Sequence, residues 1–172
     1  MKFLSAFFAV VLMSSSAFAS LYLEPYIGYE NGKVESGGSS DNLAGTNLGV
    51  KLGYGTFGFA FGVDYMRGSL KQDSSPSVTW TNQDMGVFAQ FTFPILVKVS
   101  GTYFFSTEME KDGKATGNGT KIGVGYTGLP FVAINFDMIN LNYDKFKNGG
   151  ASMDIDSDRK TWMLSVSLPL NL

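Results

Sequence analysis

Cysteine and histidine are both absent from the 172-residue sequence. Without cysteine the chain forms no disulfides, so an exported domain of this kind is held together by noncovalent packing alone. Many hydrolytic mechanisms depend on an imidazole as general base, and no other nucleophile–base pair is legible in the sequence. The sequence therefore predicts a protein that is not an enzyme and that needs no cofactor.

Long apolar runs are also scarce. The segment 3–13 is apolar, but a helix that crosses a membrane needs about 20 such residues. This segment follows Lys2 and precedes Ala17-Phe18-Ala19, which is typical of a secretory signal peptide cleaved after Ala19. The alternative is an N-terminal anchor helix. We expect a signal peptide over residues 1–19 and one mature domain over residues 20–172.

An excess of positive charge is missing as well. The chain has 13 basic and 15 acidic side chains, and loss of Lys2 with the signal peptide takes the net charge from −2 to −3. No basic stripe is present to neutralise phosphates, so the sequence predicts no nucleic-acid partner. The chain is rich in glycine and aromatic residues, with 21 Gly, 15 Phe and 8 Tyr. If the mature chain enters a membrane, it does so as strands.

Apolar and polar residues alternate with a period of two in eight segments of the mature chain, and this pattern predicts strands. In the third segment, one face holds Phe57, Phe59, Phe61, Val63 and Tyr65, and the other Gly58, Ala60, Gly62 and Asp64. In the seventh segment the alternation slips phase at Met138-Ile139, after which Ile139, Leu141 and Tyr143 continue the apolar face. We interpret this slip as a β-bulge.

The connections between the eight segments alternate in length. Three are short, at residues 55–56, 94 and 128–130, and four are long and polar, at residues 35–44, 68–77, 107–117 and 144–158. This asymmetry is typical of outer-membrane barrels, whose termini lie at the short-turn end. The predicted fold class is all-β: an eight-stranded antiparallel transmembrane β-barrel with short periplasmic turns and four longer extracellular loops.

A soluble, lipocalin-like barrel is the alternative, and glycine decides between the two. The polar face contains Gly28, Gly49, Gly53, Gly58, Gly62, Gly86, Gly123 and Gly125. Small residues are needed inside an eight-stranded barrel, whereas on a solvated outer face they would only weaken the strands. Aromatic residues flank the apolar face at both ends: Tyr29, Tyr65, Tyr103, Phe105, Tyr143 and Trp162, then Tyr54, Phe57, Phe93 and Tyr126. We therefore expect the apolar face to meet lipid.

With these features the chain resembles the small eight-stranded outer-membrane barrels of the OmpX-like family and the OmpA transmembrane domain. The resemblance is one of architecture, and it extends from Leu21 to Leu172. The alternating segment from Trp162 to Leu172 looks like the terminal signal read by the barrel-assembly machinery, although that family usually ends in an aromatic residue. The resemblance implies a location in the outer membrane of a Gram-negative-type bacterium, with outer-membrane lipid and lipopolysaccharide as partners.

Charged side chains on the polar face are the candidate site residues. They are predicted to form an interior network of Glu24, Lys51, Asp64, Asp84, Lys98, Lys121 and Asp137. Because buried charges need partners, we expect Glu24 beside Lys51 and Lys121 beside Asp137 on adjacent strands. Eight strands enclose no open channel, so these layers are expected to plug the lumen, with a gate as the other possible role.

Two further patterns lack the context that their motifs require. Residues 53–58 match G-x-G-x-x-G, but they lie between two strands and no helix follows. Asp154, Asp156 and Asp158 imitate the start of a calcium loop, yet Arg159 and Ser165 stand where a glycine and a glutamate are needed. No metal site is predicted, and divalent cations that bridge this loop to lipopolysaccharide remain an alternative.

The sequence thus favours a structural or surface-interaction protein that displays extracellular loops, in adhesion or envelope integrity. The polar loops contain charges suited to lipopolysaccharide or to a partner surface, namely Glu108, Glu110, Lys111, Asp112 and Lys114. A narrow channel for small or apolar solutes is the alternative function. A membrane-lipid-modifying enzyme comes third, because the chain lacks histidine.

Overall fold

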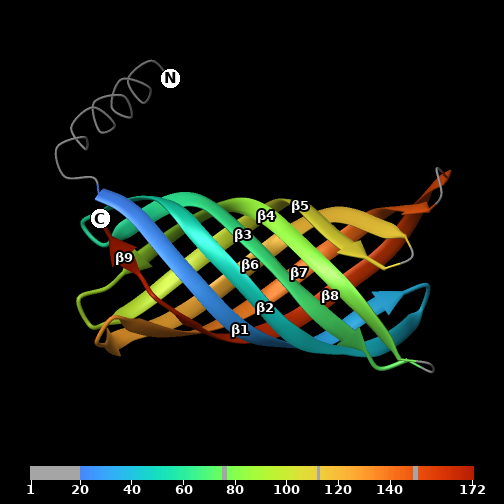
Figure 1. Ribbon diagram of the computed structural model, residues 1–172, viewed down its shortest axis with the longest axis horizontal. Helices are drawn as coiled ribbons and strands as arrows, with labels where there is room; N and C mark the ends of the chain where they lie inside the picture. The colour runs from blue at the N-terminus through green and yellow to red at the C-terminus, as the bar shows by residue number, and fades with distance from the viewer. Residues whose placement is uncertain (1–19, 75–76, 112, 149–150) are drawn as a thin grey trace, which may run out of the picture.

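The computed structural model describes residues 20–74, 77–111, 113–148 and 151–172, and the predicted signal peptide lies outside these ranges. The described part folds into one barrel of tilted strands, and β1 starts at the same end of the barrel where the chain finishes (Figure 1). No helix among these residues is long and apolar enough to cross a membrane. The strands are β1 Ser20–Ser36, β2 Ser39–Thr56, β3 Phe59–Gln72, β4 Val78–Thr92, β5 Val97–Glu110, β6 Lys114–Leu129, β7 Val132–Asn148, β8 Ala151–Ser167 and β9 Leu170–Asn171.

Antiparallel pairing closes the sheet on itself. Each strand from β1 to β8 pairs with its neighbour in sequence, and β1 also pairs with β8. Pro169 interrupts the last strand because it has no N–H for the ladder, and β9 then continues beside β1. Leu21 and Leu172 exchange two backbone hydrogen bonds there, with N···O distances of 3.1 and 2.9 Å. Since β8 and β9 occupy one position in the barrel, the prediction of eight antiparallel strands is confirmed.

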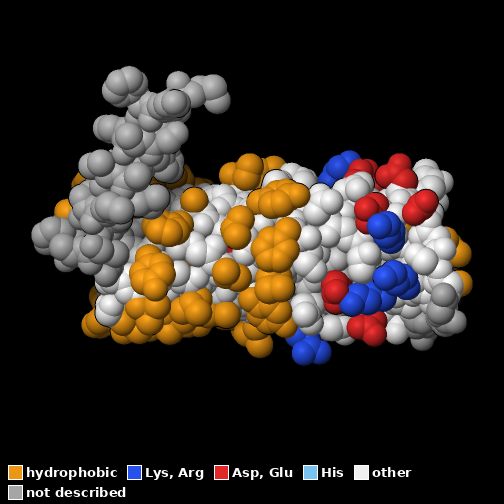
Figure 2. Space-filling view, turned by 90° about the horizontal axis from the view of Figure 1, so that it is seen from above, with side chains coloured by type: hydrophobic (Ala, Val, Ile, Leu, Met, Phe, Trp, Pro, Cys, Tyr) orange, Lys and Arg blue, Asp and Glu red, His pale blue; other side chains and the backbone are white. Residues whose placement is uncertain are grey.

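The exterior is apolar over the part of the barrel nearest the termini (Figure 2). We call this surface the apolar belt and the two ends of the barrel the terminal end and the hairpin end. Aromatic side chains border the belt on the hairpin side, including Tyr29, Tyr103 and Trp162, and on the terminal side, including Tyr54 and Tyr126. So large an exposed apolar surface suits lipid. The belt is formed by the exterior side chains within residues 21–29, 48–54, 59–65, 85–93, 97–105, 122–126, 134–138 and 162–168.

Beyond the belt the strands continue into the segments that were expected to be long loops. β1 runs on to Ser36 and β2 starts at Ser39, so this connection is a tight turn at Gly37-Gly38 with positive φ at both glycines. The strands continue through these polar segments because the exterior of the barrel faces water there rather than lipid. The seven steps from Tyr29 to Ser36 span about 23 Å along the strand. The hairpin end therefore projects beyond the belt as paired strands.

The predicted bulge in the seventh segment is wrong. Met138 stays on the exterior, the register with β8 is continuous from Asp137 to Tyr143, and Ile139, Leu141 and Tyr143 point into the barrel. Tyr143, which we expected in the aromatic border, is 1 % exposed. The apolar residues change face at this height because water surrounds the barrel and the apolar side chains fill its interior. The register shift in this pair of strands falls between Tyr143 and Lys145 instead.

Two glycines illustrate why the lumen needs small residues. A Cβ atom on Gly49 would lie 2.2 Å from the ring of Tyr26, and one on Gly123 would lie 2.0 Å from a carboxylate oxygen of Asp137. Neither approach is possible for a larger residue without displacing a lumen side chain. The interior is therefore filled by a few large polar side chains that pack over glycines, as the glycine pattern predicts.

Candidate functional site: the filled lumen and the hairpin end

All seven charged residues predicted for the lumen are buried there, and none is more than 5 % exposed. They lie at three heights together with polar side chains from most of the strands. We call these groups the terminal layer, the middle layer and the upper layer, in order from the terminal end.

Glu24 is the centre of the terminal layer. It pairs with Lys98, lies 3.9 Å from the ammonium of Lys51, and accepts hydrogen bonds from Tyr22 at 2.5 Å and Ser167 at 2.5 Å. Lys51 also faces Glu24 directly in the pairing of β1 with β2, as expected from the sequence. Because two cations and two hydroxyls meet one carboxylate, the buried charge of Glu24 is compensated.

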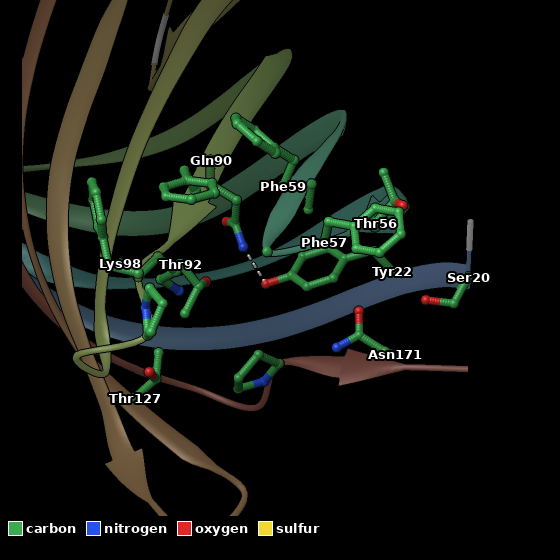
Figure 3. A pocket seen from close by; sticks show the side chains of 17 residues that line it. Ser20, Tyr22, Thr56, Phe57, Phe59, Gln90, Thr92, Lys98, Thr127 and Asn171 are labelled. Carbon is green, nitrogen blue, oxygen red and sulfur yellow. Dashed lines mark hydrogen bonds between the residues drawn. The ribbon is translucent and has the colours of Figure 1, made fainter. Parts of the chain in front are cut away.

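This layer is the floor of a cavity of about 620 Å³ that opens at the terminal end (Figure 3). Gln90 donates a hydrogen bond of 2.6 Å to the hydroxyl of Tyr22, and both side chains lie across the lumen with Lys98 beside them. The cavity therefore ends at the layer and does not continue into the barrel.

Lys121 is the centre of the middle layer, and its partner differs from the one predicted. Its ammonium lies 2.7 Å from Asp64 on β3, across the lumen, and it donates a hydrogen bond of 3.0 Å to Tyr26. Asp64 also accepts hydrogen bonds of 2.9 Å from Tyr26 and from Thr102. Asp137 makes no ion pair within 4.0 Å in the described part of the chain. Adjacency of strands favoured Asp137, but the narrow lumen lets Lys121 reach a strand on the far side.

The upper layer contains two charged residues that the sequence reasoning missed. Arg159 forms two parallel hydrogen bonds with Glu30, at 2.7 and 2.6 Å, and both side chains are completely buried. Asp84 lies 3.5 Å from the same guanidinium. A bidentate arginine–carboxylate pair is the strongest ion-pair geometry available to side chains. Extending the β8 alternation back from Met163 and Thr161 would have placed Arg159 inside the barrel.

The lumen becomes apolar toward the hairpin end. One cluster of buried side chains begins at the middle layer, where it includes Tyr26, and continues past the upper layer, with Trp80, Ala115 and Ile155 packed against it. The cluster consists of Tyr26, Leu43, Met66, Leu70, Phe104, Met109, Ile139, Leu141, Tyr143 and Met163. Polar layers thus lie where the exterior is apolar, and the apolar cluster extends to where the exterior is polar. The hairpin end is built like a water-soluble barrel on top of a membrane-embedded one.

The exterior of the hairpin end is charged (Figure 2). Lys160 pairs with Glu35 at 2.9 Å and with Asp158 at 3.5 Å, and the hydrogen bond that it donates to Glu35 raises the pKa of its ammonium. Asp154 stands opposite Lys145 in the pairing of β7 with β8. No group of three or more acidic side chains placed to hold a metal ion occurs in the ranges that the structure describes.

The fold matches solved structures of outer-membrane barrels. Neisserial surface protein A (NspA) is 20 % identical, with a TM-score of 0.56 over 87 % of this chain and 97 % of that one. Ail, the attachment invasion locus protein of Yersinia pestis, is 15 % identical, with a TM-score of 0.60 over 88 % of this chain and 99 % of that one. No model of a known family and no curated protein matches the sequence. The chain has the fold and the lipid-facing exterior of a small outer-membrane β-barrel.

Proposed function

We propose that the protein is a closed outer-membrane scaffold that displays its charged hairpin end at the cell surface, in adhesion or envelope integrity. The observation that supports this role is the projection of paired strands beyond the apolar belt, with a charged exterior and a filled interior. Strands that pair along their length hold exterior charges in fixed positions. The similarity in fold to Ail, which is named for attachment and invasion, is consistent with this role.

Lipopolysaccharide is the partner that we propose for the rim just above the belt. Arg67 follows Tyr65 on the exterior of β3 and borders a groove of about 510 Å³ with Thr46, Leu48 and Ser69. A guanidinium and two hydroxyls suit a phosphate, and the apolar wall below them suits an acyl chain. We expect Arg67→Ala to reduce the lipopolysaccharide retained by the purified barrel, and Lys71→Ala, a cation farther from the belt, to leave it unchanged. Equal retention by both variants would contradict this assignment.

The barrel-assembly machinery is the second proposed partner, through the strand formed by β8 and β9. This strand closes the barrel against β1 and has alternating apolar residues on the belt up to Leu168. We propose no catalytic role, since the whole sequence lacks histidine.

A narrow channel is the other candidate function. The cavity at the terminal end supports it, because it opens the lumen at that end as far as the terminal layer. The three layers oppose it, because polar solutes would have to break several buried ion pairs to pass. Planar-bilayer recordings separate the two: a channel gives discrete conductance steps, whereas a closed scaffold gives none.

The display role is tested by trimming one hairpin. Residues 146–153 of the β7–β8 hairpin are replaced by Asn-Gly, which forms a tight turn after the Lys145–Asp154 pair. In a deletion strain, this variant is expected to restore detergent resistance and to lose surface adhesion relative to the full chain. The control is Phe131→Gly in a turn at the terminal end. If the trimmed variant supports adhesion as well as the control does, this hairpin is not the displayed site.

A further inference from the structure

A cavity of about 300 Å³ lies at the hairpin end, inside the projecting part of the barrel. All of the strands from β1 to β8 contribute residues to its wall, so it lies on the barrel axis and its shape is fixed by the closed sheet. The volume is at the lower end of the range for small-molecule pockets, which is about 300 to 1,000 Å³.

The wall of this cavity is apolar and aromatic. Trp80, Tyr143 and Phe146 provide rings, and Met109 and Ile155 add aliphatic surface. The floor is the buried cluster around Tyr143, and the upper layer closes the lumen below it. Because the cavity has a closed floor, a molecule that enters from the hairpin end is held there and does not pass through.

Several polar side chains on the wall already form hydrogen bonds within the protein. Trp80 donates a hydrogen bond of 2.8 Å to Gln72, and Gln72 donates one of 2.7 Å to Asp41. Ser157 donates to the backbone oxygen of Glu35 at 3.1 Å. These bonds hold the Trp80 ring at the wall. No Lys or Arg is among the described residues that line the cavity, and Asp41 is, so its chemistry does not favour an anion.

We infer that this cavity, the hairpin-end cup, binds a small apolar molecule containing a ring, taken up from outside the cell. An aromatic ring packs well against tryptophan, tyrosine and phenylalanine side chains. Covering the apolar wall from water favours the binding of such a ligand. The small volume excludes a peptide strand or a folded partner. This binding role goes beyond surface display and does not depend on it.

The two tryptophans of the chain make the cup measurable. Trp162 lies on the apolar belt and Trp80 lies in the cup wall, so Trp162→Phe leaves Trp80 as the single tryptophan, whose emission is followed selectively. The probe is bromobenzene, whose heavy atom quenches indole on contact, added to the full barrel in lipid nanodiscs. We expect saturable quenching of Trp80, and added toluene is expected to relieve it by competition.

Two variants on the Trp162→Phe background locate the site. Ala115→Phe fills the cup, and Thr116→Phe adds the same ring at the next position along β6, outside the cavity wall. The inference predicts that Ala115→Phe abolishes saturable quenching and that Thr116→Phe retains it. Quenching that rises linearly with bromobenzene, or that toluene does not relieve, would overturn the inference. Both outcomes are measured on the Trp162→Phe barrel itself, so the test remains decisive even if Ala115→Phe does not fold.

Discussion

Replacing Lys121 with an uncharged residue tests the ion pair of the middle layer most directly. Lys121→Met keeps the length of the side chain but removes the ammonium that lies 2.7 Å from Asp64 and over the rings of Tyr26 and Phe104, at 4.7 and 5.3 Å. Asp64 is completely buried and would lose the cation that compensates its charge. Removing one partner of a buried ion pair costs about 3 to 5 kcal/mol.

The expected effect is large enough to measure by heat. One kcal/mol shifts the melting temperature of a 150–250-residue protein by about 2 to 4 °C, so Lys121→Met should lower it by about 6 to 20 °C. The assay follows the gel mobility of the barrel after heating, because folded and unfolded barrels migrate differently. Lys121→Met combined with Asp64→Asn should recover much of the loss, since no isolated charge remains.

Asp137→Asn is the matched control for this experiment. Asp137 shares the height of Lys121 but makes no ion pair within 4.0 Å in the described residues. We expect its melting temperature to change by less than half as much as that of Lys121→Met. An unchanged melting temperature for Lys121→Met, or an equal loss for Asp137→Asn, would refute the assignment of Asp64 as the partner.

Three other predictions concern different parts of the barrel. Arg159→Met should destabilise the barrel by about 3 kcal/mol, as it leaves the buried Glu30 without its guanidinium, and a urea titration measures this loss. Deleting residues 170–172 should lower the yield of folded barrel in the outer membrane, because the hydrogen bonds between Leu21 and Leu172 are lost. Phe131→Gly should be neutral or stabilising in the same titration, since Phe131 has a φ of 63°, a conformation that glycine adopts freely.

Much of the membrane-embedded part could be predicted because lipid outside and a narrow lumen inside impose one rule on every strand. Residues such as Phe61 and Val63 alternate with Gly62 for that reason. The rule reverses above the belt, where water meets the exterior and apolar side chains fill the interior. The predicted exterior face of Ile139 and Leu141 was therefore wrong. Nothing in the residue types shows at which height the surroundings of the barrel change from lipid to water.

The lumen partners were harder to predict for a geometric reason. Strand order identifies neighbours in the sheet, and Glu24 with Lys51 follows from it. Contacts across the lumen, such as Lys121 with Asp64, depend on barrel diameter and strand tilt, which the sequence does not state. Arg159 lies in a polar, acidic segment that is typical of a loop, and its place inside the barrel depends on the continuation of β8 through that segment.

The most direct test of a lipid-facing belt around a closed lumen uses the absence of cysteine from the chain. Single cysteines at Leu164, Ser165 and Lys160 are spin-labelled in lipid vesicles, and collisions with oxygen and with a water-soluble nickel chelate are measured. The structure predicts that Leu164 collides with oxygen, Ser165 with neither and Lys160 with the chelate. Access of the chelate to Leu164, or of both reagents to Ser165, would contradict it.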